Sequence, residues 1–363
     1  MVGKMKKYIL KRLLLIPITL FGIMLINFLF IQMAPGGPVE QMMMKMEGGA
    51  VSATASVSGL SSGMAEKSAS NSKYQGAQGV REELKHQLEK EFGFDKPLHE
   101  RFFLMIKKYL AFDFGKSFYQ DKKVTDLILE KMPVSISLGV FSTLLIYLIS
   151  IPLGIRKAQK DGSKFDILTS WAVIIGYAIP SFLFAILLVV VFAGGRYLNW
   201  FPLSGLVSDN WDSLSWYGKI LDYLWHLVLP VTAMVIGGFA GLTMLTKNSF
   251  LDEMHKNYTI TACAKGLTQT QVLYRHVFRN AMLIIVAGFP AVLVGMLFTG
   301  SVLIEVIFSL DGLGLLGFES VMNRDYPVIF GTLYMFALLG LILNLISDLT
   351  YRLIDPRIDF ERR

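Results

Sequence analysis

Six apolar runs divide the chain, and none of them contains Asp, Glu, Lys or Arg. They are residues 13–33, 135–155, 167–195, 226–246, 280–304 and 328–347. About 20 residues at a rise of about 1.5 Å cross a hydrocarbon core about 30 Å thick, so each run can span a membrane. Because lipid offers the backbone no hydrogen-bond partners, each run is expected to be helical. The pattern predicts an all-α polytopic membrane protein with six transmembrane helices.

Composition supports this class. The chain is 53% hydrophobic, with a mean hydropathy of +0.50. Charged residues make up 17%, against about 25% in soluble domains. The net charge of +7 suggests nucleic-acid binding, but its distribution argues against that partner. With the N-terminus inside, 18 basic residues flank the spans on the cytoplasmic side and 3 lie in the two short outer loops. This bias predicts that both termini are cytoplasmic.

The chain is expected to have four parts. Residues 1–33 form the cytoplasmic N-terminus and first transmembrane helix, which reads as a retained anchor because its run is too long for a signal peptide. Residues 34–133 are periplasmic, 134–354 form a five-helix core with a cytoplasmic loop at 247–280, and 355–363 are a cytoplasmic tail.

The periplasmic segment combines a linker with a small folded insertion. Residues 48–80 contain 20 Gly, Ala or Ser among 33, which indicates a flexible linker. Beyond it, Phe102, Met105, Ile106, Tyr109 and Leu110 recur at helical spacing and predict an amphipathic helix.

No nucleotide-binding or catalytic motif is complete. The sequence "GKS" at 115–117 resembles the end of a phosphate-binding loop, but Leu110 stands where that motif requires glycine. If the function needs ATP, a partner polypeptide must hydrolyse it. The single cysteine, Cys263, excludes an intrachain disulfide, and the histidines show no metal-ligand spacing. No catalytic, cofactor-binding or metal-binding residue is predicted.

The polar loop 247–280 shows the signals of a folded element. Ser249 is expected to cap a short helix, with Asp252 and Glu253 in its first turn. An apolar face is expected on the next stretch, and Gly266 is a helix stop that favours the left-handed conformation. Thr268 and Gln271 form a capping box that starts another helix. The residues of the expected apolar face are Ile260, Cys263, Ala264 and Leu267. The loop is either an amphipathic connection resting on headgroups or a docking element for a partner.

The stretch "YTITACAKGLTQTQVLYRHVFRNA" resembles the conserved cytoplasmic EAA loop of binding-protein-dependent ABC importer permeases, in its peptide-transporter version. The matching residues are Thr261, Ala262, Ala264, Lys265, Gly266, Leu267, Arg275, His276, Arg279, Asn280 and Ala281. Two positions depart from the pattern: Ile260 replaces the glutamate that names the loop, and Cys263 stands where this branch usually has arginine. The cysteine puts a salt bridge by that arginine in doubt, but not docking.

Further stretches extend the resemblance over nearly the whole chain. Those similar to dipeptide and oligopeptide permeases include "KRLLLIPITLFGIMLINFLFIQMAPGGP", "FGFDKPLHERFFLMIKKYLAFDFGKSF", "TGSVLIEVIFSLDGLGLLGFESVMNRDYPVIFG" and "DPRIDF". The insertion 48–80 and the Gly-Gly-Pro ending of the first helix look closest to the Yej-type B-subunit branch, linked to oligopeptide and microcin C uptake.

The resemblance implies a type I ABC importer permease in a bacterial inner membrane. Such a subunit forms half of the pathway for peptides or peptide-like substrates. Its partners are a homologous second permease, ABC ATPase subunits and a periplasmic substrate-binding protein. The chain itself would bind no cofactor and catalyse nothing, because ATP is used by the ATPase.

The resemblance also implies roles for particular residues. The residues that couple to the ATPase are Thr261, Ala262, Ala264, Lys265, Gly266 and Leu267. Those that anchor the loop are Arg275, His276, Arg279 and Asn280, with a simple headgroup contact as the alternative for His276. A periplasmic gate or a contact with the binding protein is expected at Glu305, Asp311, Arg324 and Asp325. For these four, a solvated rim is the alternative.

Two other classes compete with this interpretation. A self-contained secondary transporter would also consist of membrane helices, but it often shows internal repeats and broken helices, and neither is evident in the sequence. A membrane-embedded Ser/His hydrolase would need a serine and a histidine at matching depth. His226 lies at a helix start, and neither Ser181 nor Ser301 has an obvious histidine opposite it.

Overall fold

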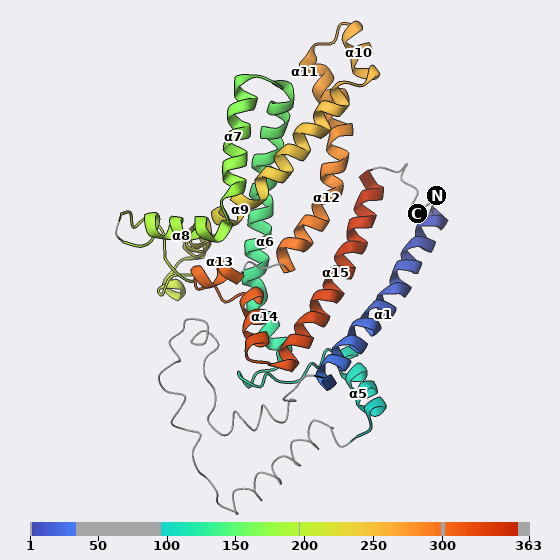
Figure 1. Ribbon diagram of the computed structural model, residues 1–363, viewed down its shortest axis with the longest axis vertical. Helices are drawn as coiled ribbons and strands as arrows, with labels where there is room; N and C mark the ends of the chain where they lie inside the picture. The colour runs from blue at the N-terminus through green and yellow to red at the C-terminus, as the bar shows by residue number, and fades with distance from the viewer. Residues whose placement is uncertain (1, 34–95, 196, 299–301, 355–363) are drawn as a thin grey trace, which may run out of the picture. The chain divides into compact units, whose positions relative to one another are not determined.

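The computed structural model describes residues 2–33, 96–195, 197–298 and 302–354. Within these ranges the chain is helical apart from turns and one isolated bridge between Lys116 and Lys123, which confirms the all-α prediction. The helices are α1 (Val2–Met33), α5 (Leu98–Leu110), α6 (Val124–Gln159), α7 (Lys164–Ala178), α8 (Ser181–Phe192), η1 (Trp211–Ser213), α9 (Trp216–Met254), α10 (Asn257–Ala264), α11 (Gln269–Val272), η2 (Leu273–Val277), α12 (Phe278–Phe298), α13 (Val302–Ile307), α14 (Leu313–Met322) and α15 (Tyr326–Ile354) (Figure 1). The predicted linker 48–80 and tail 355–363 lie outside the described residues.

The third predicted span is broken. Five helices of the described chain are each long and apolar enough to cross a membrane, whereas α7 and α8 pass that test only as a pair bent by 94°. The run 167–195, expected to form one helix, is therefore divided into two helices. The cause is Pro180, which disfavours helical geometry in the residue before it, and Ile179 is indeed extended at φ −82° and ψ 119°. Counting the bent pair as one span gives six.

The fourth span is longer than its apolar run. Helix α9 continues without a break to Met254, so the prediction that Ser249 caps a new helix is wrong. The hydroxyl of Ser249 instead donates to the carbonyl of Ala281 at 2.8 Å. The neighbouring Phe250 has no exposed area, and its burial favours the continued helix over a turn at this point.

Contacts between residues divide the chain into two compact units. Unit 1 comprises residues 1–130 and 316–338, and unit 2 comprises 131–315 and 339–363. In unit 1 the predicted amphipathic helix is confirmed as α5. Phe102 of α5 packs against Phe21 of α1, and the buried Tyr109 packs against Tyr334 of α15.

One residue of the predicted α5 face points away. Leu110 is 67% exposed. It follows the buried Tyr109 directly, and a step of one residue turns about 100° around an α-helix, which places Leu110 at the edge of the face that packs.

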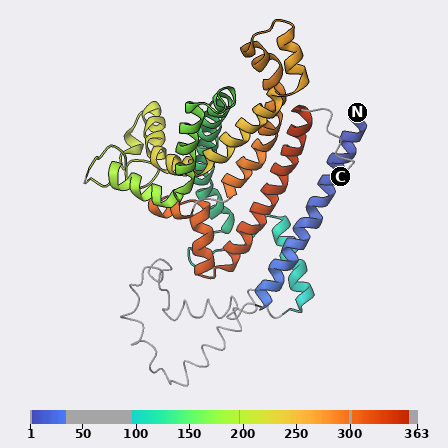
Figure 2. The ribbon, with the colours of Figure 1, turned by 45° about the horizontal axis from the view of Figure 1, so that its top comes forward.

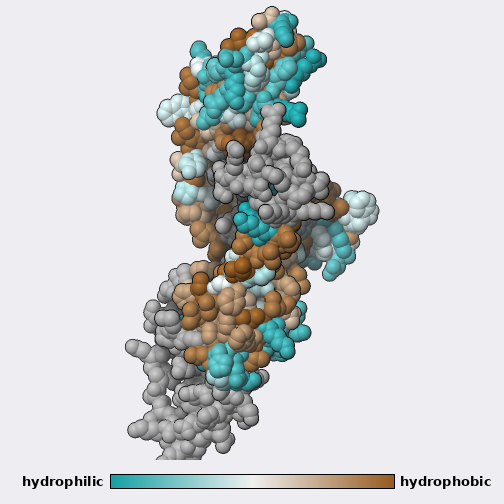
Figure 3. Space-filling view, turned by 90° about the vertical axis from the view of Figure 1, so that its right-hand side faces the viewer, coloured by the Kyte–Doolittle hydropathy of each residue, from teal (hydrophilic) through white to brown (hydrophobic). Residues whose placement is uncertain are grey.

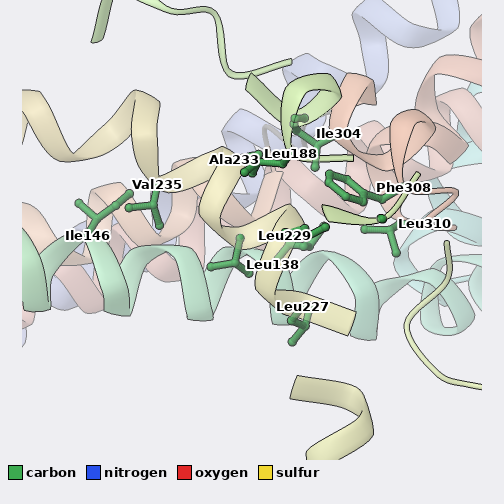
Figure 4. Close-up of a cluster of buried hydrophobic side chains, with 13 residues drawn as sticks. Leu138, Ile146, Leu188, Leu227, Leu229, Ala233, Val235, Ile304, Phe308 and Leu310 are labelled. Carbon is green, nitrogen blue, oxygen red and sulfur yellow. The ribbon is translucent and has the colours of Figure 1, made fainter. Parts of the chain in front are cut away.

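The core of unit 2 lies where α6, α8, α9 and α13 meet. Its buried members include Leu138, Ile146, Ala185, Leu188, Leu227, Leu229, Ala233, Val235, Ile304, Phe308 and Leu310 (Figure 4). Because α8 contributes to this cluster, the bend after α7 places α8 against the middle of α9 instead of extending the α7 axis.

Helices α6 and α9 cross very closely near one glycine. A Cβ atom on Gly154 would lie 2.6 Å from the Cβ of Thr246 and 2.8 Å from the carbonyl oxygen of Thr243. Near this crossing the hydroxyl of Ser150 donates to the carbonyl of Phe239 at 2.9 Å. Small residues allow such close helix packing in membranes, so this crossing fixes α6 against α9.

We expect Gly154→Ala to destabilise the protein by about 1–3 kcal/mol, because the added methyl group overpacks the crossing. The matched control is Gly241→Ala on α9, where a Cβ would meet nothing within 4 Å. That change should be neutral or stabilise the helix by up to about 1 kcal/mol. Thermal unfolding in detergent measures both, and equal melting temperatures for the two variants would contradict the close crossing.

Candidate functional site

The polar loop between α9 and α12 turns at a glycine, as the sequence predicts. Gly266 is left-handed, with φ +87°. Its amide donates to the carbonyl of Cys263 at 2.9 Å, and the amide of Leu267 donates to the carbonyl of Ala262 at 3.3 Å. These two bonds are the Schellman pattern that closes a helix C-terminus. The end of α10 is therefore fixed by the backbone itself.

The predicted capping box is also confirmed. The amide of Thr268 donates to the side-chain oxygen of Gln271 at 3.0 Å, and the amide of Gln271 donates to the hydroxyl of Thr268 at 3.3 Å. The chain then continues through α11 and the π-helical turn η2 into α12, with helical dihedrals at Leu273 and Phe278. The second half of the loop is thus a direct extension of the fifth span.

Of the four residues predicted to form the apolar face of this stretch, only Leu267 packs on the chain's own apolar cluster. Ile260 is 63% exposed, and Cys263 and Ala264 are exposed as well. The buried residues are Thr259 and Ala262, at 4% and 8%. The hydroxyl of Thr259 donates to backbone carbonyls at the end of α9, which turns this side inward. Ile260, Cys263 and Ala264 therefore leave an apolar face open on the loop.

The inward side of the loop is held by an apolar cluster. It joins α6, α9, α10, α11, η2 and α12, and α10 and α11 project beyond the ends of α9 and α12 (Figure 2). Hydrophilic residues gather around the end that carries α10 and α11 (Figure 3). The buried members of the cluster are Ile155, Ala158, Phe250, Ala262, Val272, Leu273, Val277, Ala281 and Ile285.

The four predicted anchoring residues lie on the exposed side of η2 and α12. Arg275, His276, Arg279 and Asn280 are all exposed. The side-chain nitrogen of Asn280 lies 3.4 Å from the hydroxyl of Tyr258, which gives it a contact with α10. The apolar cluster supplies the remaining attachment of this segment, so an anchoring role for the three basic side chains stays a prediction.

Tyr258 joins three helices at the base of the loop. Its hydroxyl donates to Glu253 of α9 at 2.7 Å and faces Asn280 of α12. Burial raises the pKa of Tyr258, and the bond to Glu253 raises it further. The hydroxyl therefore remains protonated and keeps its role as donor.

A charge cluster that sequence reasoning missed lies beside the loop. Lys157 of α6 has no exposed side-chain area and lies 2.9 Å from the carboxylate of Asp166 of α7. Lys247 of α9 lies 2.7 Å from Asp166 and 2.8 Å from Asp161. Two positive and two negative charges thus connect three helices. Breaking such a buried pair costs about 3–5 kcal/mol, because an uncompensated charge remains.

A sequence signal for half of this cluster exists. Ser163, at the start of α7, accepts a hydrogen bond from the amide of Asp166, whose carboxylate accepts one from the amide of Gly162. The spacing Ser-x-x-Asp before an apolar run is a capping signature. It locates the start of α7, but it does not reveal the lysines, which come from other helices.

Of the four residues predicted at the outer side, Glu305 is fully buried in unit 2. Its carboxylate accepts a hydrogen bond from the amide of Leu315 at 2.6 Å and so caps α14. Gly312 makes room for it, since a Cβ there would lie 2.5 Å from the carboxyl carbon. Asp311 forms an ion pair with Lys131 of α6, and its side chain is 65% exposed.

The other two predicted outer residues lie in unit 1. Asp325 is 4% exposed and accepts hydrogen bonds from the hydroxyl of Ser117 at 2.5 Å and the amide of Phe118 at 3.2 Å. Burial raises the pKa of Asp325, and the bonds from Ser117 and Phe118 oppose that shift. Arg324 is exposed. The alternative of a solvated rim is therefore wrong for Glu305 and Asp325, whose carboxylates hold backbone in place.

This arrangement offers no chemistry of its own within the described chain. Among those residues, no group of three or more His, Cys, Asp or Glu side chains could hold a metal ion. The site instead combines a rigid turn, a buried attachment and an open apolar face, which suits contact with another protein.

The sequence matches known transport proteins over its whole length. The family model described as "Binding-protein-dependent transport system inner membrane component" matches residues 150–360. The inner membrane ABC transporter permease protein YejB of Escherichia coli O157:H7 is 57% identical over 99% of this chain and all of the relative. The peptidoglycan transport system permease protein YejB of Agrobacterium fabrum is 58% identical over 99% of this chain and all of the relative. The oligopeptide transport system permease protein AppB of Bacillus subtilis is 32% identical over 98% of this chain and all of the relative.

We expect Thr268→Ala to weaken the start of α11 by about 1 kcal/mol, because an N-cap hydroxyl is lost. Amide hydrogen exchange over residues 269–277 should then be faster by about fivefold for an N-cap loss of this size. The matched control is Thr270→Ala, which removes an exposed threonine from the same helix without touching the capping box. Equal exchange in the two variants would contradict a stabilising box.

Proposed function

The chain belongs to the family of binding-protein-dependent transport system inner membrane components, and we propose that its α9–α12 loop is the element through which an ATPase drives uptake of peptides or peptide-like substrates. The family makes the chain a permease subunit of an ABC importer, while ATP hydrolysis takes place in a partner. Under this proposal the chain binds no cofactor and forms half of the pathway with a homologous second permease.

The observation that carries the proposal is the open apolar face of a rigid loop. Ile260, Cys263 and Ala264 are exposed, although the same helix buries Thr259 and Ala262 against its own chain. Exposed apolar patches that are rimmed by polar residues mark protein contact sites. We assign the seat on the ATPase to α10. The residues assigned to coupling are Thr261, Ala262, Ala264, Lys265, Gly266 and Leu267, of which Ala262 and Leu267 attach the seat to its own chain.

Transmission requires that the loop not deform when it is pushed. The backbone bonds around Gly266, the Thr268–Gln271 box and the apolar cluster each resist such deformation. Since α11 continues into α12 and α10 follows directly after α9, displacement of α10 would move two spans at once.

The exposed basic residues fit a second contact. Arg275, His276 and Arg279 line one side of the extension of α12 and suit either lipid phosphates or acidic groups of the ATPase. The excess of basic residues on this side supports a cytoplasmic location for the loop and for both termini. At the other side, the exposed Asp311 and Arg324 remain candidates for contact with a substrate-binding protein, whereas Glu305 and Asp325 would shape the backbone behind them.

The substrate class rests on the relatives. One YejB protein is named for peptidoglycan transport, and AppB is named for oligopeptide transport. Both substrate types contain peptide bonds, so we propose a peptide-like substrate, and uptake of microcin C, itself peptide-like, fits the same proposal. A self-contained secondary transporter leaves the rigid, open loop without a role.

We expect Gly266→Pro to abolish substrate uptake while the protein still inserts in the membrane. Proline cannot adopt φ +87°, and it removes the amide that bonds to Cys263. The matched control is Gly266→Asn, since asparagine tolerates the left-handed conformation and a Cβ here meets nothing within 4 Å.

Uptake and ATP hydrolysis are measured in vesicles that contain both permeases, the ATPase and the binding protein. The control should retain uptake, and Gly266→Pro should lose both uptake and copurification of the ATPase. Full uptake by Gly266→Pro would overturn the assignment of the loop.

A further inference from the structure

The charge cluster of Lys157, Lys247, Asp161 and Asp166 lies close to the loop that follows α9. Lys247 is seven residues before the end of α9, which is about 10 Å along the helix axis. Helix α10, the proposed seat for the ATPase, begins three residues after that end. The apolar cluster already joins the loop to α6, and the charge cluster connects α9, close to the loop, to the start of α7.

Every proton of the Lys157 ammonium group has an acceptor. The ammonium group of Lys157 donates to the carbonyl of Asp166 at 2.9 Å, to Thr169 at 3.0 Å and to Ser170 at 2.7 Å. An ammonium group has three protons, so all of its donors are used. Lys247 adds its two ion pairs to Asp161 and Asp166. These bonds and ion pairs hold the three helices together and leave no proton of Lys157 to bind a ligand.

The charge cluster connects α7 to the pair of helices, α6 and α9, that the close crossing already holds together. The crossing at Gly154 fixes α6 against α9, but it does not involve α7. Lys247 reaches from α9 to the start of α7, and Lys157 reaches from α6 to the same turn. Motion of α9 can thus pass to α7 and, through the bend at Pro180, to α8 in the unit 2 core.

We propose that Lys247 and Asp166 are positioning residues for transport, which make the α6–α7 hairpin move as one body with α9 and the loop. This inference rests on the proposed coupling role of the loop. It assigns to the cluster the transfer of ATPase-driven displacement from α10 to the broken span formed by α7 and α8.

The test compares two loop lysines in the complete importer. Lys247→Met removes both ion pairs to α7 and its preceding turn, and Lys247→Arg retains the charge. The matched control is Lys256→Met, which breaks the ion pair between Lys256 and Glu253 near α10 without touching α7. Each variant is combined with Cys263→Ser, which removes the only cysteine of the chain. Because Cys263 lies on the proposed seat, the Cys263→Ser complex with unchanged Lys247 is the reference for every comparison.

Spin labels at Leu168→Cys on α7 and Thr270→Cys on α11 report the separation of hairpin and loop, and both native residues are exposed. With unchanged Lys247, with Lys247→Arg and with Lys256→Met, the distance should be the same in nucleotide-free and ATP-trapped complexes. In Lys247→Met it should differ between the two states. One unchanged distance in Lys247→Met would overturn the proposal.

A second readout separates positioning from stability alone. Uptake of radiolabelled tri-alanine per ATP hydrolysed should fall in Lys247→Met by about 2- to 30-fold, the range for residues that modulate coupling. The ATPase should still copurify. A lower melting temperature with an unchanged uptake ratio would mean a structural role only and would overturn the proposal. If the unmodified complex takes up no tri-alanine, the proposed peptide function fails, while the distance measurement still tests the cluster.

Discussion

The packing of the loop onto the ends of α6, α9 and α12 is the constraint on which the rest depends. Phe250, Val277 and Ala281 have at most 1% exposed area and lie at the centre of that packing. Because this inner side is apolar and small, the loop can be polar elsewhere and still keep one conformation. Its opposite side then becomes available to a partner, and Ile260 of α10 is 63% exposed there.

Local signals in the sequence predicted the loop backbone well. Gly266 and the Thr268–Gln271 box act within a few residues, so the sequence specifies them without knowledge of the fold. The sequence did not show which side of α10 packs on the chain, because Ala262 is buried among residues of distant helices while Ile260 is exposed. Hydrophobic spacing alone cannot distinguish a face that packs on its own chain from one reserved for another protein.

The bend in the third span and the charge cluster also involve contacts between helices that lie apart in the sequence. Pro180 is a local signal for the bend between α7 and α8, but the apolar character of the run 167–195 predicts only that the run can span a membrane. The partners of Lys157 and Lys247 come from other helices, so their burial could not be read from charge counts. These lysines were counted as insertion signals, yet in the structure they also join helices.

The most direct test of the central claim uses Cys263, the only cysteine, which is exposed on α10. A membrane-impermeant maleimide is applied to inverted and right-side-out vesicles, with and without the ATPase. We expect labelling in inverted vesicles only, and strong protection when the ATPase is present. Labelling in right-side-out vesicles, or equal labelling with and without the ATPase, would contradict the account.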